Sequence, residues 1–372
     1  MNNLVNLADV CEFLDFKRRP ITSRDRVLGP YPYYGANGIQ GYVDKYIFDE
    51  ELVLLAEDGG HFDEPSRGVA YRVSGKCWVN NHAHVLKPKR NIDVDYLGYS
   101  LKQYDVRPFI TGAIIKKLTQ KDAKRITFYL PSLEEQQRIV KSLDHTDSLL
   151  KKRKHIIKLL DDYIDSVFFS MFVENADKKN IPLVKLKDLT TKITDGVHFK
   201  PVYTETGIPF ISVKNVTSKK LNFYGCKFVS IEDHHKFIVR CKPELGDILY
   251  TKVGATYGRA CIVDDEREFS LYVSVSLIKP VQKLVNPSYL KAVLNSSFVK
   301  RQADRSVKGA GVPDLHLIEI KNFDIPLPNT EDQNKFTTII QKVEELKQKM
   351  FTQSVEFEKQ YQSLMQKSFR LF

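Results

Sequence analysis

Basic and aromatic side chains lie beside glycines at several points of the sequence, which is the residue chemistry of polyanion binding. Residues 112–118 (GAIIKKL) and 301–309 (RQADRSVKG) combine lysines or arginines with a glycine, and residues 254–259 (GATYGR) bracket a tyrosine with two glycines. Lysine and arginine neutralise phosphates, polar and aromatic groups contact base edges, and glycine allows close backbone approach. The candidate nucleic-acid contacts chosen on these grounds are Tyr33, Tyr34, Asn37, Lys116, Lys117, Tyr257, Arg259, Arg301, Arg305 and Lys308.

Motifs for catalysis or metal binding are not found in the sequence. Residues 286–289 (NPSY) are similar to the base-holding loop of adenine methyltransferases, but the third residue differs and no FxGxG cofactor loop precedes them. No GxxxxGK[ST] phosphate loop occurs either. The histidines of 82–84 (HAH) and 234–235 (HH) lack a third ligand at matched spacing. We therefore expect a protein that is not an enzyme, with no catalytic residue, no cofactor and no metal.

The distribution of charge indicates where a polyanion would bind. The formal net charge is +11. Residues 1–130 carry 19 basic and 16 acidic side chains, and residues 173–326 carry 24 and 17, whereas residues 131–172 carry seven of each. A single lysine or arginine is more simply explained as a solvated surface charge, but a surplus confined to two long segments favours binding there. The run at 151–154 (KKRK) lies in the neutral segment, next to aspartates, and is interpreted as a solvated helix face.

Membrane and secretory classes find no support in the composition. The longest aliphatic run, residues 52–56, is far shorter than the ~20 residues of a membrane-spanning helix. The N-terminus lacks a basic region followed by an apolar stretch. Five cysteines without CxxC spacing suit reduced thiols better than a disulfide framework. We therefore expect a cytoplasmic protein without a membrane partner.

A long repeat runs through the chain. Residues 130–136 (LPSLEEQ) recur at 327–333 (LPNTEDQ), and residues 4–10 (LVNLADV) match 183–189 (LVKLKDL). Two copies of one unit, each a basic globule followed by a neutral tail, are expected from this. The predicted domains are 1–130 and 173–326, and the predicted tails are 131–172 and 327–372.

Each tail has the apolar spacing of a long helix. Apolar residues recur at spacings of three and four from Ile139 to Met171, interrupted at Thr146 and Arg153, and from Phe336 to Leu364, interrupted at Lys347 and Ser354. Neither 132–172 nor 329–372 contains proline or glycine. A long helix with one apolar stripe needs a partner, so we predict an antiparallel intramolecular coiled coil between the two tails. The alternative is two separate amphipathic helices, each docked on its own globule.

The globular segments are predicted to be α+β, two tandem mixed α/β domains rather than a regular alternation of strand and helix. Short apolar runs separated by glycine, proline and Asn-Gly turns predict strands. The best helical stretches are 94–104 and 287–301. The predicted strands are 52–56, 69–73, 210–213, 247–251, 260–263 and 273–278.

The tandem order of these features resembles the specificity (S) subunit of type I restriction-modification systems. The resemblance covers essentially the whole chain. It is carried by the two tails with their LPxLEEQ-like starts and by residues 183–189 (LVKLKDL), 194–201 (TDGVHFKP), 207–216 (GIPFISVKNV) and 246–254 (GDILYTKVG). It implies that 194–200 is a base-reading loop. The candidate contacts taken from these motifs are Thr194, Asp195, His198, Lys200, Lys214 and Lys252.

The resemblance also implies a function, a non-catalytic subunit that recognises double-stranded DNA. Each target recognition domain would read one half of a bipartite asymmetric site. The helices would set the spacer and dock two methyltransferase (modification) subunits, to which restriction subunits can be added. Two other interpretations stay open at this stage: a methyltransferase or nuclease with its own active site, and a coiled coil that only tethers partner proteins.

Overall fold

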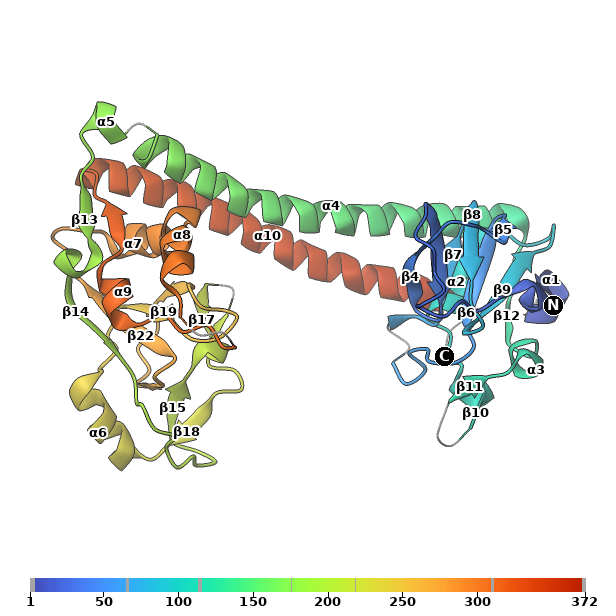
Figure 1. Ribbon diagram of the computed structural model, residues 1–372, viewed down its shortest axis with the longest axis horizontal. Helices are drawn as coiled ribbons and strands as arrows, with labels where there is room; N and C mark the ends of the chain where they lie inside the picture. The colour runs from blue at the N-terminus through green and yellow to red at the C-terminus, as the bar shows by residue number, and fades with distance from the viewer. Residues whose placement is uncertain are drawn as a thin grey trace. The chain divides into compact units, whose positions relative to one another are not determined.

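The computed structural model divides the chain into two compact units (Figure 1). Unit one is Met1–Lys154 with Phe351–Phe372, and unit two is His155–Met350. Each unit contains a mixed α+β domain and a part of both long helices. The structure describes residues 4–64, 67–112, 116–174, 176–217, 219–308 and 311–369. Ala113, Gly309 and Ala310, which belong to the candidate glycine loops, lie outside the described residues.

The domain of unit one is built on two four-stranded sheets. The first is antiparallel, in the order β2-β9-β6-β7, and the second has the order β4-β3-β8-β5 with β3 and β8 parallel. The strands are β1 (Leu4–Asn6), β2 (Cys11–Phe13), β3 (Tyr31–Gly35), β4 (Gly38–Val43), β5 (Phe48–Asp49), β6 (Leu52–Ala56), β7 (Ala70–Val73), β8 (Lys76–Val79), β9 (Ala83–Pro88), β10 (Ile110–Thr111), β11 (Lys117–Leu118) and β12 (Thr127–Tyr129). The helices of this domain are α1 (Leu7–Val10), η1 (Asp15–Lys17), α2 (Val94–Lys102), η3 (Arg107–Phe109) and α3 (Gln120–Ala123).

The domain of unit two repeats this topology. Its antiparallel sheet has the order β14-β22-β19-β20, and its second sheet has the order β18-β15-β21 with β15 and β21 parallel. The strands are β13 (Leu183–Lys185), β14 (Thr190–Asp195), β15 (Ile208–Ile211), β16 (Val216–Thr217), β17 (Lys220–Leu221), β18 (Lys227–Val229), β19 (Ile248–Thr251), β20 (Ala260–Ile262), β21 (Ser270–Leu271), β22 (Val275–Pro280) and β23 (Asp324–Pro326). The helices are α5 (Ala176–Lys179), η4 (Leu186–Leu189), η5 (Val213–Asn215), α6 (Ile231–Arg240), α7 (Pro287–Leu294), α8 (Ser297–Ser306) and α9 (Leu317–Lys321).

The six predicted strands appear as β6, β7, β15, β19, β20 and β22, each within two residues of its expected ends. The helix predicted over 94–104 is α2. The prediction of one helix over 287–301 is wrong, because this segment forms α7 and then α8. Ser296 adopts an extended conformation and its hydroxyl accepts a hydrogen bond from the Val299 amide, so that a new helix is capped there.

Two 40-residue helices, α4 (Leu133–Phe172) and α10 (Thr330–Phe369), pack together in antiparallel order (Figure 1). In unit one, Arg153 of α4 donates to Gln353 of α10 at 2.7 Å and stacks on Phe357. In unit two, Lys347 of α10 lies 3.0 Å from Asp161 of α4. The predicted antiparallel pair is confirmed, and every predicted seam position of both helices is buried or half-buried.

The seam is polar at Arg153 and Lys347, and each of these side chains contacts a side chain of the other helix, Gln353 and Asp161 respectively. The ends of the pair also enter the domain cores. Leu143 and Met365 belong to the apolar cluster of unit one, and Phe172 and Phe336 belong to that of unit two, with ring centroids 5.3 Å apart. The helices therefore combine both sequence-based interpretations, since they pair with each other and dock on the domains.

Candidate nucleic-acid interface

Three separate segments of unit one meet at one end of the antiparallel sheet. The loop after β6 and the segment around β11 are joined by the β-bridge between Asp58 and Lys117. The Leu118 amide also donates to the Glu57 carbonyl at 2.7 Å. Asn37, in the turn between β3 and β4, donates its amide to the Gly59 carbonyl at 2.9 Å. The structure thus brings together Asn37 and Lys117, which are far apart in the sequence.

The cations of this loop cluster are exposed but already paired. The side chains of Lys116 and Lys117 are 50% and 45% exposed. Lys116 lies 2.5 Å from Asp63, and Lys117 lies 2.8 Å from Glu57. An exposed ion pair of this kind contributes little to stability and can be exchanged for a phosphate contact. Both lysines therefore remain accessible candidates.

Of the two candidate tyrosines, only one is accessible. Tyr33 is 1% exposed, and its hydroxyl is hydrogen-bonded to the Ile21 backbone while Arg26 stacks on its ring. Tyr34 is half-buried and packs beside Tyr71. Side chains of a strand alternate between two faces, so adjacent tyrosines of β3 cannot share one surface. Tyr33 is thus corrected from a surface contact to a core residue that supports this strand.

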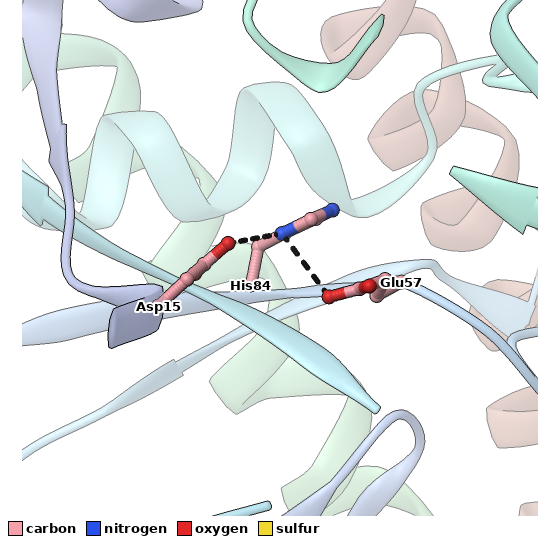
Figure 2. A group of neighbouring side chains, drawn as sticks. All are labelled: Asp15, Glu57 and His84. Carbon is pink, nitrogen blue, oxygen red and sulfur yellow. Dashed lines mark hydrogen bonds and ion pairs between the residues drawn. The ribbon is translucent and has the colours of Figure 1, made fainter. Parts of the chain in front are cut away.

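A buried ionic network lies beneath the cluster, where Asp15 and Glu57 flank His84 (Figure 2). His84 is fully buried, with Nδ1 2.6 Å from Asp15 and 3.5 Å from Glu57. Its Nε2 lies 2.8 Å from the Leu118 carbonyl oxygen, so each ring nitrogen lies beside an oxygen atom of the protein. The three side chains have the residue types of a metal site, and in the structure they contact one another while Arg18 donates to Glu57.

Neighbouring cations hold both carboxylates of this network in the ionised form. Burial alone would raise the pKa of Asp15, but the hydrogen bond and charge of His84, with further bonds from Gln120 and the Val85 amide, lower it below its ordinary value. Burial likewise opposes ionisation of Glu57, and its pairs with Lys117 and Arg18 lower its pKa. The Glu57–Lys117 pair therefore links the exposed loop to the buried network.

In unit two, corresponding segments meet at the same end of the antiparallel sheet. The loop after β19 meets residues 308–315 through the bridge between Val253 and Asp314, and the Leu315 amide donates to the Lys252 carbonyl at 2.9 Å. Gly254 and Gly59 follow the same bridging position in the two units, and both have positive φ, +83° and +65°. Such a backbone favours glycine, so these two glycines shape matching loops.

The charges at these matching positions are exchanged between the units. In unit one, Glu57 of the sheet pairs with Lys117. In unit two, the residue in the place of Glu57 is Lys252, and it lies 3.7 Å from Asp314, which occupies the place of Lys117. The two loop clusters therefore share a backbone but present opposite charges at one surface position.

The candidates of unit two differ widely in accessibility. Thr194, Asp195 and Lys252 are buried, so their side chains are corrected from direct contacts to supports of the surface. Tyr257 and Arg259 are half-buried, and the Tyr257 hydroxyl donates to Asp304 of α8 at 2.5 Å. Ion pairs join Asp195, His198 and Lys252. The exposed candidates of this unit are His198, Lys200, Lys214, Arg301, Arg305 and Lys308.

Not all of these exposed residues belong to the loop cluster. Arg301 stacks on Phe169 of α4, with its guanidinium 5.0 Å from the ring centre, and Lys214 lies on η5. Lys308 belongs to the cluster, because its backbone bridges Asp314. Sequence reasoning missed Arg240, whose guanidinium reaches Asp195 from the end of α6. Only the position of Asp314 carried a signal, since the repeat aligns it with Lys117.

The chain thus combines a duplicated α+β domain, with matching loop clusters at the same end of each antiparallel sheet, and a pair of long helices. The family described as type I restriction modification DNA specificity domain matches residues 2–160 and 178–354. The chain belongs to this family, and it is a DNA sequence-recognition subunit of the type I restriction-modification class.

Known proteins that are similar to this chain are named as specificity subunits of type I restriction enzymes. A provisionally named type I restriction enzyme specificity subunit of Haemophilus influenzae is 28% identical over 347 residues, 91% of this chain and 87% of the relative. The MjaVIII specificity subunit of Methanocaldococcus jannaschii is 23% identical, over 92% and 86% of the two chains.

Solved structures agree on the fold. An S subunit from M. genitalium superposes with a TM-score of 0.55 at 14% identity, covering 98% of this chain and 95% of that one. A chain from a structural study of type I complex assembly and conformational transition gives 0.62 at 17% identity, covering 98% and 96%. In the part of the chain that the structure describes, no helix is long and apolar enough to cross a membrane.

Proposed function

We propose that the chain acts as the non-catalytic reader of a type I complex, in which each domain recognises one half of a bipartite asymmetric DNA site. The observation that carries this proposal is the duplicated loop cluster, built at the same sheet end in both units from the same backbone but with different side chains. Two similar scaffolds with different surface chemistry are suited to two different half-sites.

The antiparallel helix pair would set the number of unread base pairs between the half-sites. This role is supported by the length of α4 and α10, 40 residues each, and by their seam, which fixes their register. A protein ruler of this kind acts as dimer geometry does in other DNA-binding proteins, where the distance between reading elements selects the half-site spacing.

Apolar side chains outside the seam support the docking of protein partners. On α4 in unit two, Ile156, Leu159 and Tyr163 are 41%, 48% and 50% exposed and share one helix face. On α10 in unit one, Phe351 and Val355 are 59% and 42% exposed. Since each unit has an exposed apolar stripe, we propose two docking sites, one for each of two methyltransferase subunits, to which restriction subunits can be added.

A cytoplasmic location belongs to the same proposal, because the partners and the DNA are there. The five cysteines, which are all free thiols, support it.

The test is to express the chain with the methyltransferase subunit of its own system and to map methylated bases by sequencing. A motif of two defined halves separated by unspecified bases is expected, and the chain alone should transfer no methyl group. A short continuous motif, or methylation by the isolated chain, would contradict the proposal. Replacing Tyr163 by Ser should weaken capture of the methyltransferase, while exposed Lys158→Ser on the same helix serves as the matched control.

A further inference from the structure

A buried carboxylate collects cations at the end of β14. The Asp195 side chain is 3% exposed, and it accepts hydrogen bonds from Arg240 Nη2 at 2.8 Å and from His198 Nε2 at 2.9 Å. Lys252 Nζ lies 3.5 Å away on the inner side and is 8% exposed. One buried aspartate thus connects the first sheet strand, the loop that follows it and the end of α6.

The two outer partners of Asp195 are displayed to solvent. The side chains of Arg240 and His198 are 58% and 56% exposed, and Arg240 Nη2 lies 3.5 Å from His198 Nε2. Lys192 adds a further cationic group, and its ammonium donates to the Arg240 carbonyl at 2.6 Å. A guanidinium carries five N–H donors in a fixed planar fork, so the bond to one nitrogen orients the group and leaves donors for a second anion.

The charges behind the displayed pair largely compensate one another. Lys252 lies between Asp195 and Asp314, at 3.5 and 3.7 Å. Arg240 and Lys192 offset the second carboxylate and leave an excess of positive charge, even with His198 neutral. The excess lies on the exposed side and the best-buried carboxylate lies below it, which is the polarity that a phosphate group requires.

Unit one contains the same aspartate in a closed arrangement. Asp15 lies two residues after Phe13, which pairs with Leu86, as Asp195 lies two residues after Ile193, which pairs with Ile278. Each aspartate has a basic residue as its partner three residues later, Arg18 in unit one and His198 in unit two.

The exposure of those partners differs sharply between the units. Arg18 is only 13% exposed and donates to the buried Glu57 and to the Ala83 carbonyl. His84, the other side chain that contacts Asp15 from the sheet, is fully buried. In unit one the aspartate therefore holds a structural network together, whereas in unit two it holds cations at the surface.

We propose that Arg240 and His198 form a binding site for a backbone phosphate of the DNA, and that Asp195 is the positioning residue that orients them. This inference rests on the DNA-reading role of unit two. The site supplies affinity and fixes the position of the domain on the duplex, but reads no base. Unit one lacks such a site at the equivalent position, so the two DNA-recognition domains differ in how much of their affinity depends on phosphate contacts.

The test uses the chain assembled with its methyltransferase subunits and measures dissociation constants for cognate and unrelated duplexes by fluorescence anisotropy over a range of KCl concentrations. Arg240→Ala should weaken binding to both duplexes by about tenfold at low salt, since a charge-assisted hydrogen bond is lost. The slope of log K against log salt should fall by about one. The methylated motif should stay the same.

Arg267→Ala is the matched control, because Arg267 lies in the same unit, is 59% exposed and pairs with its own aspartate, Asp265. It should leave the slope unchanged. Asp195→Asn should lower the slope toward that of Arg240→Ala, and the double variant should show no further loss. Arg240→Lys should keep the slope but weaken binding, because the charge remains and the fork is lost.

The outcomes separate the inference from the function on which it rests. If the wild-type complex binds no duplex specifically, the DNA-reading role fails. If the wild type binds but Arg240→Ala leaves affinity and slope unchanged, or Arg267→Ala lowers them equally, the phosphate site is wrong. If Asp195→Asn is unstable, His198→Ala tests the same point. Loss of the His198 side chain alone should weaken binding to the cognate and the unrelated duplex by the same factor.

Discussion

Gln136 and Gln333 make the same three hydrogen bonds in the two units. Gln136 Oε1 accepts from the Asp93 amide at 2.8 Å, and its Nε2 donates to the carbonyls of Asn91 and Pro131. Gln333 Oε1 accepts from the Asn286 amide at 2.8 Å, and its Nε2 donates to the carbonyls of Leu284 and Pro328. Both side chains are buried, at 0% and 2% exposure. Each glutamine therefore fastens the start of a long helix to the segment that leads into α2 or α7.

Replacing either glutamine by glutamate should destabilise its unit by about 2–4 kcal/mol, because the carboxylate would face two carbonyl oxygens and the two N–H donors would be lost. Thermal unfolding of Gln136→Glu and Gln333→Glu measures the effect. Gln137→Glu is the control, since Gln137 is the exposed neighbour on the same helix turn. Equal stability of the two neighbouring variants would show that these hydrogen bonds contribute little.

The glutamines illustrate what the sequence could and could not predict. The repeated LPxxEEQ-like motif correctly indicated where α4 and α10 begin, since Ser132 and Asn329 before each helix accept from the amides of Glu135 and Asp332. The heptad spacing of apolar residues predicted which positions of α4 and α10 form the seam. The role of Gln136 was not predictable, because two of its three partners, Asn91 and Asp93, lie more than 40 residues earlier and these contacts exist only after the domain has folded.

The candidate site was predictable to a smaller extent, for the same reason. Residue type selected Lys116 and Lys117, which are exposed, but also the buried Tyr33, and the family resemblance selected Lys252, which is buried too. Burial of these two depends on strand pairing that the local sequence does not specify. Arg240 was overlooked because nothing near it in the sequence marks it, and its surroundings come from the distant Asp195.

Two buried tyrosines of unit two provide a matched test of hydrogen bonding in the core. Tyr250 and Tyr289 are both fully buried in the same apolar cluster. The Tyr289 hydroxyl donates to the Pro326 carbonyl at 2.7 Å, whereas the Tyr250 hydroxyl has no hydrogen-bond partner among the described residues. Tyr289→Phe should cost about 1 kcal/mol, and Tyr250→Phe should be neutral or stabilising, since it removes an unpaired polar group.

Chemical denaturation of the two phenylalanine variants under identical conditions measures this difference. Because the ring stays in place in both, any change reflects the hydroxyl. A loss in Tyr250→Phe as large as that in Tyr289→Phe would mean that the Tyr250 hydroxyl gains a partner in solution.

Acid should weaken unit one through its buried network. The pKa values of Asp15 and Glu57 are lowered in the folded protein. A carboxyl with a lowered folded pKa stabilises the fold above its unfolded pKa, about 4, and this stabilisation is lost as the pH falls through the folded pKa. Asp15→Asn should therefore lower stability by about 1–3 kcal/mol at neutral pH, because the hydrogen bonds of the buried carboxylate with His84, Gln120 and the Val85 amide are weakened or lost.

The difference between the wild type and Asp15→Asn should shrink as the pH falls from about 5 to about 3, because Asp15 in the unfolded wild-type chain then binds a proton more readily than Asp15 in the folded protein. Melting temperatures measured across this range test the sign. Asp44→Asn, which changes an exposed aspartate of the same unit, should follow the wild type in parallel. A gap that stays constant or widens in acid would show that Asp15 does not stabilise the fold as a carboxylate.

Lengthening the helix pair should change the spacer and leave the half-sites alone. One heptad inserted after Lys154 and one after Met350 would preserve the seam and the pairing of the two helices, and these positions lie where the compact units divide. Seven residues extend a helix by about 10 Å, so the spacer can grow by at most about three base-pair steps. The two domains must also follow the helical twist of the DNA, which favours a smaller increase in spacer length.

Methylation mapping of the complex with the double insertion gives the spacer and both half-sites in one experiment. An insertion in α4 alone is the control, since it shifts the seam against an unchanged α10 and should reduce assembly rather than select a new spacer. Altered half-sites with the original spacer would mean that the helices influence base reading within the domains. A longer spacer with both half-sites intact requires the reading surfaces to lie wholly within the domains, where the loop clusters of units one and two are found.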